Sequence, residues 1–576
     1  MKLKIPAILA ATFGLLSSAY LALGLYEHKS HAAAPTGGTI AGLYCEGYGF
    51  YTGGATCPQP PGDGAPVLMF SDLTYGSKTG WDGSATEGAV VTVWGRNLGT
   101  EGTRGTDYVT VGGVNLTDDT DYLDTWAETS NPVPFLETVT FQLNSSMADG
   151  NTEISVTVGG VTSNVLNFTI GAGAIYFVAQ DAPASGTDGS LANPYDCTDF
   201  VGVVNPGDVV YFRGGNYVDK CNGGKSNIWY RDTYTNGTAS QPIALGAYPN
   251  EVPLMDGITN GDTSNFNKSM QISANYVTLF KMTGYALGPA VETQGDYVRI
   301  VGNNLQGATQ FIAGTGIIIG SQDGNEYIGN ATWGARSNNR LDHAIYLNSC
   351  SPNVGVKVGY NWIYDNQYDR GPSISINHQE TRCPSNVALA SHYVYNNVID
   401  CTNFATRGIG VFDLSWDVGE AQEPDPTYVY NNILINCGTG GYAAMYHNNG
   451  HAEFFNNTLF GLQGNGFDAA GGGVLSTKFI NNVIQGSTYE CVDGLPSSLD
   501  NNAYFGGCVV PAGDLSAITS DPKMTINVGT DTYDLAPDSP LIDAGSVASN
   551  AIVNDDFLGR GRNNTSIDVG ALEDKL

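Results

Sequence analysis

Charge is scarce in this sequence, and positive charge is the scarcest kind. Charged residues make up 14% of the 576 residues, against about 25% in an average soluble domain. The 24 lysines and arginines face 56 aspartates and glutamates, which gives a net charge of −32. Proteins bind nucleic acids mainly by neutralising phosphates, so this balance excludes a nucleic-acid partner. An acidic substrate would need a local reversal of charge or a bridging cation.

Three sequence patterns are also absent. No long stretch repeats apolar residues with the 3.6-residue period of a helix, which excludes a helical-repeat solenoid. Neither a CxxC pair nor a cysteine–histidine spacing typical of zinc occurs. A DxDxDG calcium loop is missing too, and SQDGNE at 321–326 matches it only weakly. Calcium stays an open alternative as a cofactor of an acidic extracellular protein, and no metal ligand is assigned.

What the sequence repeats is a short phrase built around asparagine. It reads VGNN at 301–304, YIGN at 327–330 and GYNW at 359–362, and it continues as VYNN (twice), FFNN, FINN and LDNN. The first asparagines of the copies are Asn303, Asn330, Asn361, Asn396, Asn431, Asn456, Asn481 and Asn501. Successive copies lie 20 to 35 residues apart. A repeat of this length indicates a repeat architecture.

Each interval has the composition of one coil of a parallel β-helix. A β-branched or aromatic residue usually precedes the asparagine, a short apolar run follows it, and a second short strand pattern lies in most intervals. Asparagine suits the corner between strands because it tolerates left-handed backbone angles and its amide can bond neighbouring backbone. We expect the asparagines to stack into a ladder of amides, with a structural and not a chemical role.

Two segments resemble the large pectate-lyase-like family of right-handed parallel β-helices. Residues 176–219 resemble its usual opening, in which a strand leads to a short capping helix, a PGD turn and a strand ending in RGG. Residues 533–545 (YDLAPDSPLIDAG), with the later DFLGRGR and IDVGALE, resemble an ending common among secreted bacterial members. The resemblance covers residues 174–576 and implies the fold. It selects no activity, because the family includes lyases, hydrolases, epimerases and non-enzymatic adhesins.

The chain before this region divides into three parts. Residues 1–34 contain two lysines, then a long apolar run and three alanines. This pattern predicts a cleaved secretory signal, or an uncleaved anchor, since the apolar run is long enough to span a bilayer. Residues 35–65 are a linker rich in glycine, proline and tyrosine. Residues 66–170 alternate apolar and polar residues over short strands and resemble the immunoglobulin-like IPT/TIG domains, which implies a β-sandwich. The predicted class is therefore all-β, a sandwich followed by a right-handed parallel β-helix.

Ten cysteines are typical of an exported, oxidised protein. Neighbours in sequence suggest the pairs Cys45–Cys57, Cys197–Cys221, Cys350–Cys383, Cys401–Cys437 and Cys491–Cys508, although sequence alone does not fix connectivity. We expect the protein to be secreted or at the cell surface, in the extracellular or periplasmic space. Attachment to the surface would run through the N-terminal region, and we expect a monomer.

The most informative region for function is 336–451. Between 336 and 407 six basic residues face five acidic ones, so this window carries +1 while the other 504 residues carry −33. The asparagine intervals between Asn361 and Asn431 are also the longest, at 35 residues. Insertions in repeat proteins usually form loops on the binding face. Both observations place a substrate along these coils.

Strand alternation predicts which side chains of these coils face outward. In HAIYLN, SISIN and GIGVF the isoleucine, leucine and valine residues should point inward, which leaves an outer strip of aromatic, amide, histidine and arginine side chains. The candidate catalytic residues are His343, Tyr346, Arg370, His378 and Tyr446. The candidate substrate-binding residues are Arg340, Asn348, Lys357, Asn377, Arg382, Arg407, Phe412, Asp413 and His447. Such a strip suits an extended carbohydrate.

The leading hypothesis is a polysaccharide lyase that cleaves an acidic, uronate-containing polysaccharide. Arginine or lysine would neutralise the uronate carboxylate, histidine would remove the C5 proton, and tyrosine would protonate the leaving oxygen. An epimerase would use similar groups. A hydrolase would need two carboxylates, and the NTD, DD and GHG motifs of β-helical polygalacturonases are missing. A surface adhesin or glycan-binding protein without turnover is the other alternative.

Overall fold

The computed structural model describes residues 43–45 and 49–51, where β1 (Leu43–Cys45) and β2 (Gly49–Tyr51) lie, and most of 64–574. Within the last range, the residues outside the description are 100–104, 125, 127–130, 184–185, 219–225, 232–233, 258–267, 287, 308–315, 321, 336–341, 350–352, 368–370, 379–389, 404–406, 414–425, 439–441, 449, 470–473, 488, 495, 550–551 and 563–564. The predicted signal segment 1–34 also lies outside it. Over the described ranges, no helix is both long and apolar enough to cross a membrane.

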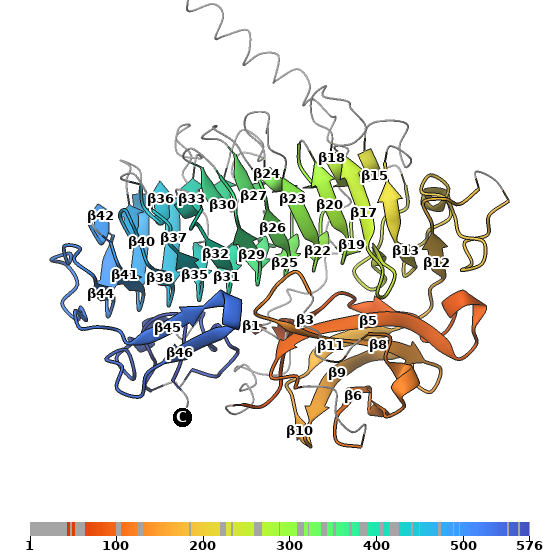
Figure 1. Ribbon diagram of the computed structural model, residues 1–576, viewed down its shortest axis with the longest axis horizontal. Helices are drawn as coiled ribbons and strands as arrows, with labels where there is room; N and C mark the ends of the chain where they lie inside the picture. The colour runs from red at the N-terminus through yellow and green to blue at the C-terminus, as the bar shows by residue number, and fades with distance from the viewer. Residues whose placement is uncertain are drawn as a thin grey trace, which may run out of the picture. The chain divides into compact units, whose positions relative to one another are not determined.

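Three long parallel sheets form the main body of the protein (Figure 1). Sheet I consists of β12 (Ile175–Val178), β13 (Val209–Phe212), β16 (Ile243–Ala247), β19 (Val277–Phe280), β22 (Arg299–Val301), β25 (Glu326–Ile328), β28 (Lys357–Gly359), β31 (Tyr393–Tyr395), β34 (Thr427–Tyr430), β37 (Gly450–Phe455), β40 (Val474–Ile480) and β43 (Ser498–Asp500). Sheet II consists of β14 (Gly215–Tyr217), β17 (Pro253–Gly257), β20 (Thr283–Ala286), β23 (Asn304–Gly307), β26 (Ala331–Trp333), β29 (Trp362–Tyr364), β32 (Val398–Asp400), β35 (Ile433–Ile435), β38 (Thr458–Phe460), β41 (Val483–Gln485) and β44 (Ala503–Phe505). Sheet III consists of β15 (Ser226–Tyr230), β18 (Lys268–Ile272), β21 (Val291–Thr293), β24 (Gly316–Gly320), β27 (His343–Ser349), β30 (Pro372–His378), β33 (Arg407–Asp413), β36 (Met445–Asn448), β39 (Phe467–Ala469) and β42 (Val492–Gly494).

The chain visits the three sheets in turn, so each coil adds one strand to each sheet. Paired strands in all three sheets run parallel, as between β27 and β30. The predicted inward residues Ile345, Leu347, Ile374, Ile376, Ile409 and Val411 are each at most 2% exposed and belong to the interior apolar cluster. The prediction of an all-β chain with a right-handed parallel β-helix is confirmed.

A ladder of buried asparagines runs through the corner between sheets I and II. Each Nδ2 donates to the Oδ1 of the asparagine one coil further on, at 2.9 to 3.1 Å. The members are Asn303, Asn330, Asn361, Asn397, Asn432, Asn457, Asn482 and Asn502. The ladder ends where Asn502 Nδ2 donates to Asp514 Oδ2 at 2.8 Å. All eight asparagines are fully buried, so the ladder supplies amide partners that water cannot.

The sequence pattern identified the ladder but misplaced five of its members. In the five later NN copies the first asparagine, such as Asn396 or Asn431, adopts a left-handed conformation (φ 51° and 52°) and the second asparagine joins the ladder. In the three earlier copies Gly302, Gly329 and Tyr360 take the left-handed position, and the next residue is the ladder asparagine. Left-handed backbone favours glycine and asparagine, and this explains why the two residue types alternate there.

Residues 66–170 form a two-sheet β-sandwich. One sheet consists of β3 (Val67–Ser71), β5 (Glu87–Arg96) and β8 (Glu137–Asn144). The other consists of β4 (Tyr75–Gly76), β6 (Tyr108–Val111), β7 (Val114–Leu116), β9 (Gly150–Val158), β10 (Val161–Thr162) and β11 (Leu166–Ile170). The helical elements among the described residues are short 3-10 turns: η1 (Trp81–Gly83), η2 (Asp119–Asp121), η3 (Phe200–Gly202), η6 (Val528–Thr530) and η7 (Val547–Ser549).

The sandwich packs against the outer face of sheet I, and both belong to one compact unit. Val90 N donates to Tyr211 Oη at 2.9 Å, and that hydroxyl donates back to Val90 O at 3.0 Å. The Trp81 ring lies 5.1 Å from the Tyr211 ring and meets it edge-on. Arg299 on β22 donates to the backbone oxygens of Ser71 and Asp72 at 3.0 and 2.8 Å. These contacts bury aromatic side chains that an isolated β-helix would expose.

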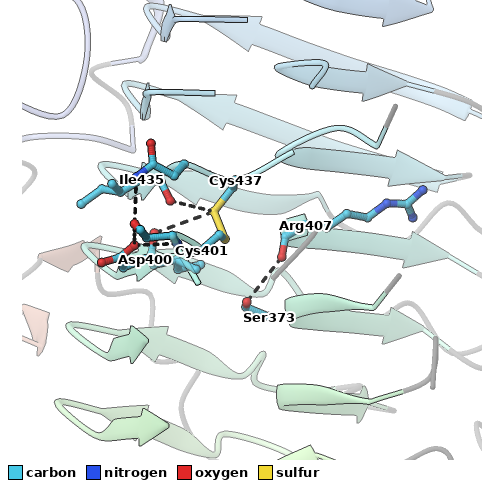
Figure 2. Close-up of a disulfide and its surroundings, with 9 residues drawn as sticks. Ser373, Asp400, Cys401, Arg407, Ile435 and Cys437 are labelled. Atoms are coloured by element: carbon cyan, nitrogen blue, oxygen red, sulfur yellow. Dashed lines mark hydrogen bonds between the residues drawn. A yellow bond between two sulfur atoms is a disulfide. The ribbon is translucent and has the colours of Figure 1, made fainter. Parts of the chain in front are cut away.

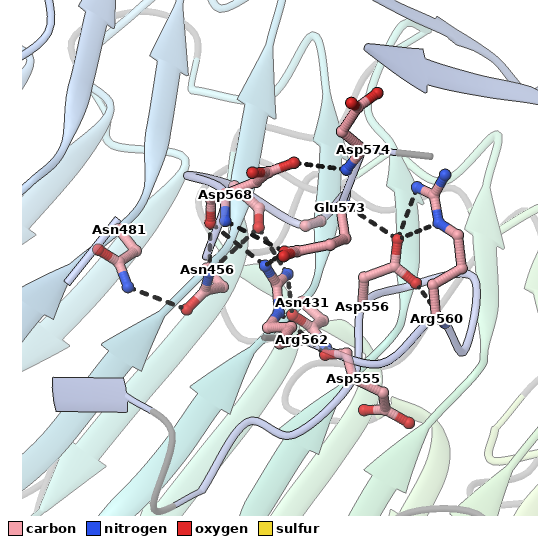
Figure 3. Close-up of polar contacts among 12 residues, drawn as sticks. Asn431, Asn456, Asn481, Asp555, Asp556, Arg560, Arg562, Asp568, Glu573 and Asp574 are labelled. Carbon is pink, nitrogen blue, oxygen red and sulfur yellow. Dashed lines mark hydrogen bonds and ion pairs between the residues drawn. The ribbon is translucent and has the colours of Figure 1, made fainter. Parts of the chain in front are cut away.

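The C-terminal segment, residues 521–574, includes the antiparallel strands β45 (Met524–Asn527) and β46 (Thr532–Leu535). It covers the corner between sheets I and II along the later coils, beyond the part that the sandwich covers. The left-handed asparagines hold it: Asn431 Nδ2 donates to Asp555 O, and Asn456 Nδ2 donates to Asp568 O (Figure 3). Buried Arg562 donates to Asn431 Oδ1 at 3.1 Å and to Glu573 Oε2 at 2.7 Å. Burial raises the pKa of Glu573 to about 7, although Arg562 opposes the shift.

Two of the predicted disulfides are confirmed. Cys401–Cys437 joins two adjacent coils just after β32 and β35, as Figure 2 shows, and Cys491–Cys508 joins a later pair of coils. Cys197 is also in a disulfide. The cysteines of the remaining predicted pairs, Cys45, Cys57, Cys221, Cys350 and Cys383, lie outside the part of the chain whose side chains are described.

Candidate functional site

The outer face of sheet III carries most of the candidate residues. It is defined here as the outward side chains of β24 to β39. Register pairs Tyr346, Ser375, Gly410, Tyr446 and Asp468 into one row across five successive strands. A second row two positions further along the strands consists of Asn348, Asn377, Phe412 and Asn448. The strand register therefore brings five candidates onto one surface: Tyr346, Tyr446, Asn348, Asn377 and Phe412.

Arg407 and Tyr446 form the most distinctive group of this face. The Arg407 guanidinium lies 4.5 Å from the centre of the Tyr446 ring and 4.8 Å from that of Tyr442, distances at which a cation is attracted to a ring face. The Phe412 ring lies 5.3 Å from the Tyr446 ring. The start of β33 is anchored because Ser373 Oγ donates to Arg407 O at 3.4 Å (Figure 2).

The surroundings of the Tyr446 hydroxyl raise its pKa. Burial is the largest cause that raises its pKa, and Asp468 on the neighbouring strand raises it further. Arg407 acts in the opposite direction and lowers it. Because the net shift is upward, Tyr446 holds its proton at neutral pH.

His343 and Tyr346 form a second group on β27. Their rings stack at 5.0 Å with an interplanar angle of 16°. His343 Nδ1 donates to Pro372 O at 2.7 Å, because that carbonyl can only accept. Burial lowers the pKa of His343 to about 4. The side chain is therefore neutral at pH 7, with its orientation fixed by the neighbouring strand.

Small and polar side chains lie between these two groups. Asn377 Nδ2 donates to Ser375 Oγ at 2.9 Å, and both residues are buried although they face outward. Asn348 is likewise only 7% exposed. At Gly410 an added Cβ would lie 2.6 Å from the Phe412 ring and 2.8 Å from Pro372 Cγ, so the phenyl ring covers the glycine.

Two candidates lie away from this face. Lys357 belongs to β28 of sheet I, where its Nζ contacts Glu326 Oε1 at 2.8 Å inside a partly buried ion-pair group with Arg299. His447 was expected outside, but it follows Tyr446 in the alternation and faces the interior, where Nδ1 lies 2.7 Å from Thr477 Oγ1. Neither position lets the side chain contact a ligand on sheet III.

The remaining candidates are not described in side-chain detail. Arg340, Arg370 and Arg382 lie outside the described residues. The backbones of His378 and Asp413 are paired in register at the ends of β30 and β33, but their side chains are outside the description. Both strands end where the two longest connections to sheet I begin, residues 379–392 and 414–426.

Sequence reasoning missed Tyr442 and Asp468. Tyr442 precedes β36 and contributes its ring to Arg407, and a strand pattern starting at Met445 gives no sign of this contact. Asp468 could have been found, because the short FDA strand (467–469) follows one coil after Tyr446. Across the described part of the chain, no group of three or more histidine, cysteine, aspartate or glutamate side chains is placed to hold a metal ion.

No protein-family model and no curated protein matches the sequence. Among solved structures, a pectate lyase has a TM-score of 0.43 and 17% identity, covering 69% of this chain and 96% of its own. A rhamnogalacturonan lyase has a TM-score of 0.34 and 12% identity, covering 60% and 85%. A family PL6 polysaccharide lyase from Pseudopedobacter saltans has a TM-score of 0.30 and 12% identity, covering 56% and 91%. Likeness at this level says nothing about activity, and the fold rests on the strand order itself.

Proposed function

We propose that the protein is an exported, carbohydrate-active enzyme that cleaves a uronate-containing polysaccharide by β-elimination on the outer face of sheet III. The observation that carries this proposal is the Arg407 guanidinium stacked on Tyr446 beside the Phe412 ring. In this group Arg407 supplies a cation that can bind a carboxylate, Tyr446 a hydroxyl that can donate a proton, and Phe412 an aromatic surface for a sugar. The confirmed disulfides support export, since such bonds persist in oxidising compartments.

The proposed chemistry assigns one task to each group. Arg407 neutralises the uronate carboxylate, which lowers the cost of negative charge at C5. A base removes the C5 proton, the C4–oxygen bond breaks, and Tyr446 donates its proton to the leaving oxygen. A tyrosine ordinarily titrates near pH 10, so the Tyr446 hydroxyl carries its proton at neutral pH and can donate it.

The choice of base follows from the low pKa of His343. Burial lowers that pKa to about 4, which leaves His343 a weak base, so His343 with Tyr346 is proposed as a binding subsite. His378, at the end of β30, is the proposed base, because a histidine pKa ordinarily lies near neutral pH. Asn377 and Asn348 are proposed to bond sugar hydroxyls.

Substitution of the two central groups tests the proposal. Tyr446→Phe and Arg407→Gln should each lower kcat on an active uronate polysaccharide by a factor on the order of 10² or more. The readout is the ultraviolet absorbance of the unsaturated product. Tyr393→Phe on sheet I is the matched control, since Tyr393 also stacks on a tyrosine, Tyr428, at 5.6 Å. Full activity in both sheet III variants would overturn the assignment.

A second candidate function is glycan binding without turnover, as in an adhesin. On this face the pKa of His343 is lowered and that of Tyr446 is raised, so both move further from neutral pH. Groups with such pKa values are poorly matched to proton transfer at neutral pH, and this favours binding alone. Glycan binding with no unsaturated product, no new reducing ends and no epimerised uronate would establish it. New reducing ends without unsaturation would indicate a hydrolase instead. The sandwich is proposed to be an IPT/TIG-like spacer or binding module.

A further inference from the structure

The outer face of sheet II carries a second row of aromatic side chains that the function proposed above does not use. Register pairs Tyr285, Gln306, Trp333, Tyr364, Asp400 and Ile435 on six successive strands. Each is half-buried, whereas the middle residue of a strand, such as Ile363, faces the apolar interior. The row spans roughly 24 Å at the usual strand spacing and continues to Phe460.

Two neighbouring rings of this row, those of Trp333 and Tyr364, are close to parallel. The Trp333 and Tyr364 rings lie 6.1 Å apart at an interplanar angle of 16°, and Trp362 lies 5.0 Å from Tyr364 at 15°. Trp333 Nε1 donates to Asn304 Oδ1 at 2.8 Å, which fixes the indole across two strands. An aromatic group that is already ordered loses little conformational freedom when a ligand binds.

Position along the strand explains why this row is not simply packing surface. The first outward residues of β32 and β35, Val398 and Ile433, are buried and belong to the cluster formed with the sandwich and the C-terminal segment. The third residue, which forms the row, retains exposure on every strand from β20 to β38. The covering segments therefore end beside the row and leave it accessible.

Charge decides what kind of ligand fits. The row from Tyr285 to Phe460, all of it described, contains no lysine, arginine or histidine, and its one charged residue is Asp400. The whole chain carries −32. The described residues of the row themselves offer a uronate chain no cation, and the net charge of the protein disfavours an acidic ligand. Sheet III differs because Arg407 lies on its outer face.

We infer that the outer row of sheet II binds a neutral polysaccharide chain. Sugars pack along the outer edges of the stacked Trp333 and Tyr364 rings, and hydroxyls bond to Gln306 and Asp400. The row would hold the protein on a neutral glycan while sheet III faces an acidic one. The inference stands on sheet II alone and does not depend on catalysis at sheet III.

Titration with neutral oligosaccharides tests the inference. The probes are cellohexaose, xylohexaose and mannohexaose, and the readouts are calorimetry and tryptophan fluorescence. Wild-type protein should bind at least one probe, and Trp333→Ala should weaken that binding about tenfold or more, as removal of a central aromatic contact does. Tyr428→Ala, which removes one ring of a stacked pair on sheet I, is the matched control and should bind as wild type.

Each other outcome contradicts the inference. Wild type that binds none of the probes, or Trp333→Ala that binds them normally, removes the neutral-glycan site. Self-association lost in Trp333→Ala would show that a second copy of the chain occupies the row. Preference for uronate oligosaccharides at Trp333 would contradict the charge argument. If Trp333→Ala unfolds, Gln306→Ala and Tyr364→Ala carry the same test, with circular dichroism as the check of folding.

Discussion

The outer faces of sheets I and III carry similar side chains, but those of sheet I are covered by other segments and those of sheet III keep partial exposure. Sheet I presents Tyr211, Phe280, Tyr395, Tyr430 and Phe455, each at most 2% exposed in one apolar cluster with the sandwich and the C-terminal segment. Sheet III presents Tyr346, Phe412 and Tyr446, which stay half-buried. Both sets are outward aromatics on successive coils. An outward aromatic on a β-helix therefore indicates function only where no other segment covers it.

Charged groups follow the same division. On sheet I, Glu326 accepts from Arg299 at 2.9 Å and from Lys357 at 2.8 Å, and these charges lower its pKa to about 2 against the effect of burial. That group is complete within the protein, and Arg299 also binds the sandwich backbone. On sheet III, the Arg407 guanidinium lies against the Tyr446 and Tyr442 rings. Basic residues of one sequence window thus lie in an ion-pair group on one sheet and against aromatic rings on the outer face of another.

The largest expected effect is on the covered face. Tyr211→Ala removes a ring between Trp81 and Phe280 and both hydrogen bonds to Val90, so it should lower the free energy of unfolding by about 3–5 kcal/mol. Tyr346→Ala, on sheet III, is the counterpart. Urea unfolding monitored by circular dichroism measures both. Equal losses would erase the distinction between the faces.

The interface between the sandwich and sheet I should also depend on pH. Burial raises the pKa of Asp72 to about 6, although Lys281 opposes the shift. The folded protein therefore holds this proton more tightly than the unfolded chain does, and stability should fall as pH rises from about 4 to about 6. The contribution is up to about 3 kcal/mol.

Asp72→Asn provides the measurement. Its amide oxygen can still accept from Thr92 N and Leu73 N, so the fold is preserved while the titration is lost. Thermal unfolding between pH 4 and pH 7, in the range that these pKa values define, should show a shallower decline in the variant than in wild type. Parallel declines would show that Asp72 is not the titrating group.

An effect of about 1–3 kcal/mol is expected inside the coils, behind both faces. Asn397→Ala breaks the ladder, because it removes the acceptor of Asn361 N and one hydrogen bond each from the side-chain amides of Asn361 and Asn432. Asn396→Ala leaves the ladder intact, because its neighbour supplies the amide. Urea unfolding should therefore separate two adjacent asparagines, with turnover unchanged in both. A larger loss at Asn396 would contradict the ladder assignment.

The smallest stability effect should come from the exposed face. Tyr446→Phe removes one hydroxyl and keeps the ring beneath Arg407, so the free energy of unfolding should change by less than about 0.5 kcal/mol. The same variant should lose most of its turnover. Thermal unfolding measured beside the ultraviolet assay tests both statements. A large loss of stability would mean that Tyr446 serves packing, as Tyr211 does.

Local patterns in the sequence predicted the coils, the inward residues and most of the sheet III face, because strand period and repeat spacing act over a few residues. Which sheet faces are covered by other segments of the chain could not be predicted in this way. Tyr211 is hydrogen-bonded to Val90, 121 residues away in the sequence, and Asn431 to Asp555, 124 residues away. A local sequence pattern does not predict such contacts. Lys357 and His447 were misplaced for a related reason: a basic or histidine residue near a strand does not reveal which sheet or face receives it.

Hydrogen–deuterium exchange with and without a uronate oligosaccharide tests most directly the claim that sheet III is the functional face. The account predicts slower exchange in β27, β30, β33 and β36 when the ligand is bound, and no change in β13, β28 or residues 66–170. Protection confined to sheet I or to the sandwich, with none on sheet III, would contradict it.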